Sequence, residues 1–215
     1  MPKTLTPLQA EVLQLFFKCG AADWGYFLTG GTALSEYYLQ HRRSEDLDLF
    51  NRSGRNPAED AAVLQHYLEP RGIQMTSESA GVTFARIYVS RRPDEWLRIE
   101  LANDVRQQIA PLRDFEGIRV DSLEDIAVNK ICALSRQEPK DCIDLYFILT
   151  ETSLTLEYLL ERARLKDAAF DDARAHLQFA SDLLRVSSLA VPALMIKPLS
   201  LEEMRSRLKA EAEKI

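Results

Sequence analysis

The sequence contains few of the residues that build disulfide frameworks or zinc sites. Its 215 residues include three cysteines and three histidines. The histidines are scattered, and the cysteines are an odd number without a CxxC pair, which disfavours both a disulfide scaffold and a zinc motif. Unpaired cysteines suit a reducing compartment, so we expect the protein to be cytoplasmic.

Long apolar runs are also missing. The apolar stretches fall well short of the roughly 20 residues that a membrane-spanning helix needs, so we expect no transmembrane helix and no membrane partner. The N-terminus runs into the start of an amphipathic helix and lacks the apolar core of a signal peptide.

An excess of positive charge is absent as well. The formal net charge is −6, which argues against a protein that coats nucleic acid through a basic surface. It leaves room for a local basic site.

The sequence does have the composition and periodicity of a globular protein, with 46% hydrophobic and 28% charged residues. In the first half, apolar periodicity predicts helices near 6–18, 32–40 and 57–68, and strands at 26–29, 47–50, 72–78, 82–90 and 96–102. In the second half it predicts only helices, at 122–136, 139–150, 154–165, 172–186 and 200–213.

This order of elements predicts an α+β fold in two domains. Residues 1–118 would form a small mixed β-sheet flanked by helices, and residues 119–215 a C-terminal helical domain. Two helix starts carry capping signals. Thr32 is placed to cap the helix at 32–40, and Ser122 with Asp125 resembles a capping box.

Gly30 and Gly31 end a predicted strand and precede a predicted helix. Glycines let the backbone approach an anion closely, and the free N–H groups at a helix start point toward it. This pattern indicates a phosphate site, although a tight turn that simply requires glycine explains it too.

Acidic residues follow at short range. Asp46 and Asp48 stand at i and i+2 on a predicted strand and therefore share one face, while Leu47 and Leu49 turn to the core. Two carboxylates side by side repel each other unless a cation lies between them, and aspartate oxygens suit Mg²⁺. Glu100 offers a third carboxylate if its strand is a neighbour. Otherwise it is a solvent-facing residue paired with Arg98.

At this point the sequence resembles a known family. Two blocks carry the resemblance, Gly30–Leu34 and His41–Phe50, and they are similar to the signature of the DNA polymerase β-like nucleotidyltransferases. A further block, Lys130–Arg136 followed by Lys140–Tyr146, narrows the resemblance to the AbiEii/AbiGii toxin family. The resemblance covers about residues 27–150.

The resemblance implies a metal-dependent nucleotidyltransferase that moves a nucleoside monophosphate from a nucleoside triphosphate (NTP) to an acceptor hydroxyl. Asp46, Asp48 and Glu100 would hold Mg²⁺ or Mn²⁺, and Gly30, Gly31 and Thr32 would bind phosphates. The acceptor would be RNA, tRNA-like in character. The protein would be the toxin of a type IV toxin–antitoxin or phage-defence system, with a cognate antitoxin as partner.

Six other residues of the resembling blocks have roles that the sequence leaves more open. We expect Lys130 to contact phosphate, and Asp144 to position Lys130 or assist catalysis. Alternatively, Lys130 pairs with Asp141 or Asp144 and ties two helices together. Arg42 and Ser44 would contact the nucleotide, or Arg42 would brace the loop. Arg136 and Asp141 are expected to be structural.

Two other functions remain open. The acceptor is a small molecule in related enzymes of the superfamily. A non-catalytic nucleotide-binding module with the same fold would also carry the glycine turn, although the complete acid set argues against it.

Overall fold

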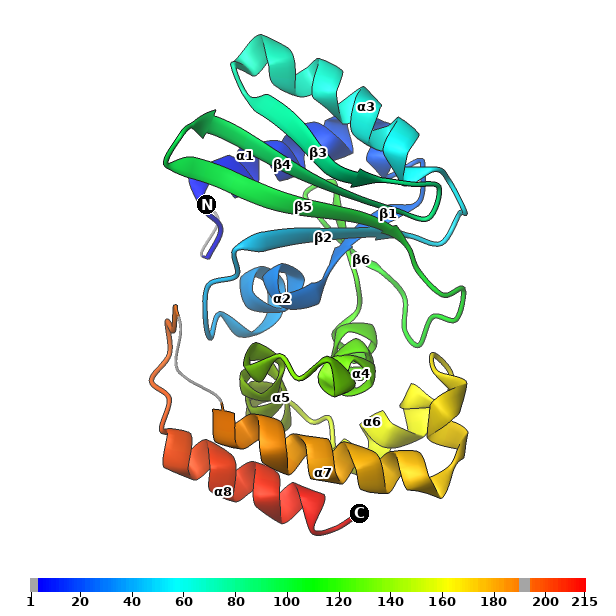
Figure 1. Cartoon of the computed structure of the whole chain (residues 1–215), viewed down its shortest axis with the longest axis vertical. Helices are drawn as coiled ribbons and strands as arrows, with labels where there is room; N and C mark the ends of the chain where they lie inside the picture. The colour runs from blue at the N-terminus through cyan, green and yellow to red at the C-terminus, as the bar shows by residue number, and fades with distance from the viewer. Residues whose placement is uncertain (1–3, 190–193) are drawn as a thin grey trace. The chain divides into compact units, whose positions relative to one another are not determined.

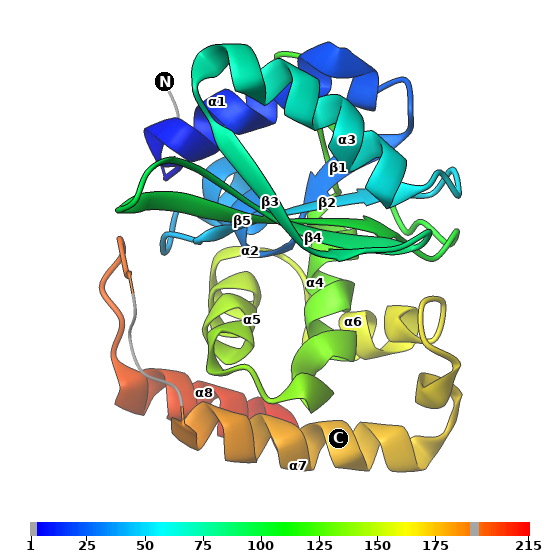
Figure 2. The same cartoon turned by 45° about the horizontal axis from the view of Figure 1, so that its top comes forward.

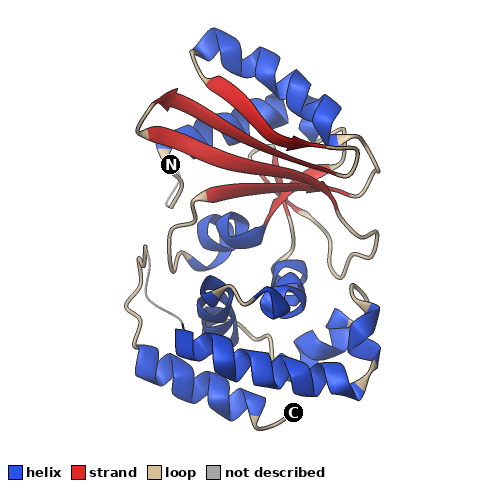
Figure 3. Cartoon of the chain, in the orientation of Figure 1, coloured by secondary structure: helices blue, strands red, loops and turns tan. Residues whose placement is uncertain are grey.

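The computed structural model describes residues 4–189 and 194–215. These residues form two compact units, one built on a sheet and one of helices (Figures 1 and 3). The sheet unit comprises the chain up to Tyr37, Arg43–Arg106 and Pro111–Asp121. The helical unit comprises Tyr38–Arg42, Gln107–Ala110 and Ser122–Ile215, so two short segments from the predicted first domain belong with the helices.

The sheet unit contains one seven-stranded mixed sheet with the strand order β3-β4-β5-β2-β1-β7-β6. The strands are β1 (Tyr26–Thr29), β2 (Asp46–Asn51), β3 (Gln74–Ala80), β4 (Phe84–Arg92), β5 (Glu95–Asn103), β6 (Arg113–Phe115) and β7 (Ile118–Val120). β2 pairs with β5 and β1 with β7 in parallel, and the other neighbours are antiparallel. The predicted α+β fold class is confirmed.

Two helices, α1 (Pro7–Phe16) and α3 (Pro57–Leu68), cover one face of this sheet (Figure 2). Alternate side chains of the central strands are buried; they include Leu47, Leu49, Ile87, Val89, Ile99 and Leu101. Both helices begin at side-chain caps, Thr6 for α1 and Asn56 for α3, with proline in the first turn. Burial of one face of the sheet leaves the polar residues of β2 and β5 on the other.

Two parts of the sheet unit differ from the sequence prediction. The short strands β6 and β7 were not predicted, because three residues are too few to show an alternating pattern. α2 (Gly30–Ala33) begins two residues before Thr32 and continues as a π-helical turn (Leu34–Leu39). The prediction that Thr32 caps this helix is therefore wrong. Its hydroxyl is buried and donates to the backbone carbonyl of Asp46.

The helical unit agrees with the five predicted helices. They are α4 (Leu123–Ala133), α5 (Pro139–Glu151), α6 (Leu156–Ala163), α7 (Ala173–Leu189) and α8 (Leu201–Ala212). Short 3₁₀ turns (Leu134–Arg136 and Ala168–Asp171) follow α4 and precede α7. In the described part of the chain, no helix combines the length and apolar character needed to cross a bilayer.

Asp125 fastens three parts of the helical unit together. Its carboxylate is fully buried and accepts hydrogen bonds from Ile109 N, Ala110 N and Ser122 Oγ. It also forms an ion pair of 2.7 Å with Lys166, whose side chain is only 3% exposed. The segment before α4 is thereby bound to the helix start and to the loop after α6.

We predict that Asp125→Ala lowers the free energy of unfolding by about 3–5 kcal/mol, because the buried Lys166 ammonium would lose its partner. Urea unfolding monitored by circular dichroism would measure the loss. Asp114→Ala is the control. Asp114 is exposed and accepts one hydrogen bond from Gly117 N, so its loss should cost under about 1 kcal/mol. Equal effects of the two substitutions would contradict the role of Asp125.

Candidate active site

The parallel pairing of β2 with β5 brings the three predicted acids to one region of the sheet. Asp48 lies directly opposite Glu100 in the register, and Asp46 lies two residues before Asp48 on the same face. All three side chains are partly exposed, whereas Leu47 and Leu49, which alternate with the aspartates on β2, are fully buried. The neighbouring strand that the sequence could only assume is therefore present.

Gly30 lies against this acid row. Thr29, the last residue of β1, pairs with Asp48 across the antiparallel β1–β2 ladder. Gly30 has a φ of +69°, and a Cβ atom on it would lie 2.0 Å from Asp48 Oδ2. Both facts require glycine at this position. The glycine turn and the Asp48 carboxylate are therefore in direct proximity.

Two arginines lie on the same face of the sheet as the acids. Arg98 lies opposite Asp46 in the register, and its guanidinium donates to the Asp46 carboxylate. Arg86 lies opposite Glu100 on β4 and binds its Oε1 through Nε (3.0 Å) and Nη2 (2.9 Å). Burial would lower the pKa of Arg98, but the charge of Asp46 raises it above its ordinary value.

The chemistry of this donor set fits a hard divalent cation, since three carboxylates of one face lie on neighbouring strands. The space that Gly30 leaves for the Asp48 carboxylate is also consistent with a cation site. Within residues 4–189 and 194–215, however, no three His, Cys, Asp or Glu side chains converge as a ready metal site. Two of the three acids are directed toward arginines instead.

Lys130 and Asp144 belong to a buried ion cluster in the helical unit. Asp144 is fully buried and contacts His41 Nε2 (2.7 Å), Arg42 Nε (2.6 Å) and Lys130 Nζ (2.7 Å). Lys130 also donates to Asp141 at 2.6 Å. This is the helix-tying arrangement that the sequence left as an alternative, joining α4 to α5. Arg42 belongs to the same cluster. Its contact with Asp144 corresponds to the alternative in which Arg42 braces the loop.

The charges of this cluster are mutually compensated. Burial by itself would raise the pKa of the Asp144 carboxyl, but Lys130, Arg42 and the hydrogen bond from His41 hold that pKa well below its ordinary value. Burial would lower the pKa of the Lys130 amine, but Asp144 and Asp141 raise it. Both groups are therefore ionised across the neutral range.

The remaining predicted residues lie in the sheet unit. Gly31 and Thr32 are buried in α2. The backbone carbonyl of Ser44 accepts from Gln9 Nε2 at 2.8 Å, which fixes the loop before β2 to α1. The sequence analysis did not identify Arg86 as a partner of Glu100 or His41 as a partner of Asp144. Arg86 lies in the strand predicted at 82–90, but the sequence does not show that this strand pairs with the one that carries Glu100.

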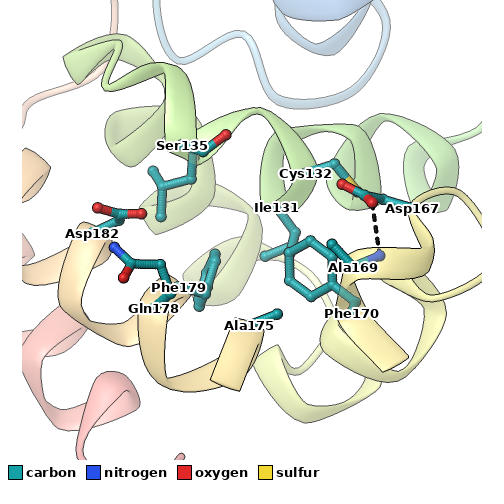
Figure 4. A pocket seen from close by; sticks show the side chains of 11 residues that line it. Ile131, Cys132, Ser135, Asp167, Ala169, Phe170, Ala175, Gln178, Phe179 and Asp182 are labelled. Carbon is teal, nitrogen blue, oxygen red and sulfur yellow. Dashed lines mark hydrogen bonds between the residues drawn. The ribbon is translucent and has the colours of Figure 1, made fainter. Parts of the chain in front are cut away.

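A separate pocket of about 170 Å³ lies inside the helical unit (Figure 4). Its walls are largely apolar and include Ile131, Phe170 and Phe179. The two acids that line it have local partners: Asp167 Oδ1 accepts from Ala169 N, and Asp182 pairs with Arg185. None of the predicted catalytic or nucleotide-binding residues lines this pocket, so it is not the candidate site.

Comparison with known proteins identifies similar chains. The family described as nucleotidyl transferase AbiEii toxin, of type IV toxin–antitoxin systems, matches residues 21–215. No curated protein matches the sequence.

Solved structures share the fold over nearly the whole chain. A protein of Helicobacter pylori described as a nucleotidyltransferase is 24% identical, with a TM-score of 0.64 over 98% of this chain and 95% of its own. JHP933, also from H. pylori, is 24% identical, with a TM-score of 0.62 over 95% and 89%. The nucleotidyltransferase toxin MenT4 of Mycobacterium tuberculosis is 12% identical, with a TM-score of 0.55 over 94% and 81%.

We predict that Gly30→Ala destabilises the protein more than Gly72→Ala does. Both glycines have a φ of +69°, so both substitutions carry the backbone strain of about 1–2 kcal/mol. Only the new Cβ at position 30 would collide with Asp48, whereas position 72 has no atom within 4 Å. The collision should add about 1–3 kcal/mol in chemical denaturation. Equal losses of unfolding free energy in the two variants would show that a Cβ atom at position 30 does not collide with Asp48.

The ion cluster predicts a pH dependence of stability. The pKa of Asp144 is depressed in the folded protein, so its stabilisation is complete above the ordinary carboxyl pKa of 3.8 and declines as pH falls below it. The raised pKa of Lys130 places a second decline above 10.5. Wild-type protein should exceed Asp144→Asn by about 3–5 kcal/mol in unfolding free energy near neutral pH. Denaturation curves over a pH series measure this difference, and a difference that persists at pH values far below 3.8 would refute it.

Proposed function

This chain belongs to the AbiEii family of nucleotidyltransferase toxins, and from that premise we propose that it transfers a nucleoside monophosphate from an NTP to a hydroxyl of an RNA acceptor, with release of pyrophosphate. A single observation carries the proposal. The Asp48 carboxylate lies between the glycine turn and Glu100, so the elements that would bind triphosphate and cation are adjacent in the sheet unit.

Asp46, Asp48 and Glu100 would hold Mg²⁺ or Mn²⁺. When bound, the cation supplies positive charge that neutralises the phosphates and favours attack by the acceptor hydroxyl. The protein itself supplies position. The β2–β5 ladder fixes the spacing of Asp48 and Glu100, and Thr32 ties the backbone of Asp46 to α2. Such pre-set geometry lowers the entropic cost of bringing the reactants together.

The triphosphate would lie over Gly30, Gly31 and Thr32, where the two glycines lack Cβ atoms and let an anion approach the backbone closely. Ser44 precedes the acid strand and would contact the nucleotide.

Lys130, Asp144 and Arg42 would complete the catalytic and nucleotide-binding set. The support for them is the sequence motif together with their contacts. Asp144 holds both Lys130 and Arg42 within 2.8 Å, as a residue that positions two phosphate-binding cations would.

RNA is the proposed acceptor because the resemblance of the glycine, acid and lysine blocks to the AbiEii/AbiGii toxin family implies it. The family description also names a toxin–antitoxin system, so we propose a cognate antitoxin as the protein partner. With a net charge of −6, the chain would bind RNA through a local surface and not through its overall charge. A small-molecule acceptor is the second candidate, and binding without transfer the third.

We predict that Asp48→Asn removes nearly all transfer activity. The assay incubates the protein with total RNA, Mg²⁺ and each α-labelled triphosphate in turn. Wild-type protein should label RNA, and the variant should do so at least about 100-fold more slowly, because a direct ligand matters more than its supporting residues. Expression of wild-type protein should slow bacterial growth, and the variant should relieve it.

Asp94→Asn is the matched control, since Asp94 is an exposed aspartate in the turn between β4 and β5 of the same sheet. It should retain full transfer. Label that moves only onto small molecules would favour the second candidate. Triphosphate binding without transfer would favour the third, and undiminished transfer by Asp48→Asn would refute the proposed site.

A further inference from the structure

Cations and anions lie side by side on one face of the sheet. One row of the register contains Asp46, Arg98 and Tyr88, and the next contains Asp48, Glu100 and Arg86. Each arginine therefore stands beside an acid along the ladder, and Arg98 also follows Glu100 at two-residue spacing on β5. The geometry places two guanidinium groups where the acid set needs positive charge.

The ion pairs follow this register. Arg98 binds Asp46 and lies 3.9 Å from Glu100, while Arg86 binds Glu100 at 2.9 Å. Arg98 also interacts electrostatically with all three acids, since Asp46, Glu100 and Asp48 each favour its charged form. The two arginines together offset most of the negative charge that the three carboxylates concentrate.

A carboxylate oxygen that accepts from a guanidinium is directed away from other ligands. This explains why no three acidic side chains converge as a metal site in the described residues, although their strands are correctly placed. We propose that Arg98 and Arg86 are built-in counter-cations that compete with a divalent metal ion for Asp46 and Glu100, and thereby set the metal affinity of the site. This inference rests on the metal site of the proposed function.

The Arg98–Asp46 and Arg86–Glu100 ion pairs are exposed enough for each arginine to be replaced by a metal ion. The side chains of Arg98 and Arg86 are 33% and 34% exposed, and those of Asp46 and Glu100 are 16% and 20% exposed. Partly solvated ion pairs are weak, since water stabilises the separated guanidinium nearly as well. The fully buried carboxylate of Asp144 is the opposite case and has no such freedom.

The test measures binding of Mn²⁺ without nucleotide, from the electron paramagnetic resonance signal of the free ion. Arg98→Gln should tighten binding about tenfold, because one competing and repelling charge is removed from the site. Arg86→Gln should act in the same direction. Both gains should shrink at about 1 M salt, which screens charges at partly exposed sites.

Arg92→Gln is the matched control. Arg92 lies on β4 with Arg86 but pairs with Glu95 at 3.5 Å, outside the acid row. It should leave Mn²⁺ binding unchanged. Asp48→Asn, alone and combined with Arg98→Gln, tests whether the ion binds at the acids. Circular dichroism verifies that each variant is folded.

Tighter binding by the arginine variants that disappears with Asp48→Asn supports the inference, including the case in which wild-type binding is too weak to detect. Unchanged or weaker binding by folded Arg98→Gln overturns it. If Asp48→Asn still removes the binding, the metal site of the proposed function survives. If no variant binds Mn²⁺ at the acids, both fail, and the labelled-triphosphate assay shows whether transfer itself remains.

Discussion

Repulsion among the carboxylates of Asp46, Asp48 and Glu100 is the constraint on which the sheet unit depends. The β2–β5 ladder holds them on one face. That face cannot turn inward, because a slip of one residue would bury the acids and expose Leu47 and Leu49. The helices on the other face therefore fix the register, and positive charge must balance the acids. Arg98 and Arg86 provide it in this structure.

The helical unit handles buried charge in a different way. Asp144 gathers His41, Arg42 and Lys130 around one buried carboxylate, and every distance is at or below 2.8 Å. Such a cluster is costly to break, because any lost partner leaves a charge without compensation in a medium of low polarity. Its residues come from the segment before β2 and from α4 and α5. The segment Tyr38–Arg42 is thus anchored to α4 and α5 within the helical unit.

Much of the fold was accessible from periodicity. The alternation of β2, β4 and β5 and the 3.6-residue pattern of the later helices predicted most elements with ends within a few residues. The predictions failed where the pattern is short or where tertiary contacts compete. β6 and β7 have three residues each, and Thr32 uses its hydroxyl on the carbonyl of Asp46 instead of a helix N-terminus. The family and its reaction class were predicted from the glycine and acid motifs together.

The sequence alone determined which side chains share a strand face, since the two-residue period places Asp46 with Asp48 and Arg98 with Glu100 whatever surrounds them. Only the tertiary structure decided that β5 lies beside β2 and that Glu100 stands opposite Asp48. The same is true of the arginine partners and of the cluster around Asp144. The physical reason is that strand order and helix packing arise from burial over the whole chain, and a local pattern carries no record of which distant segment becomes its neighbour.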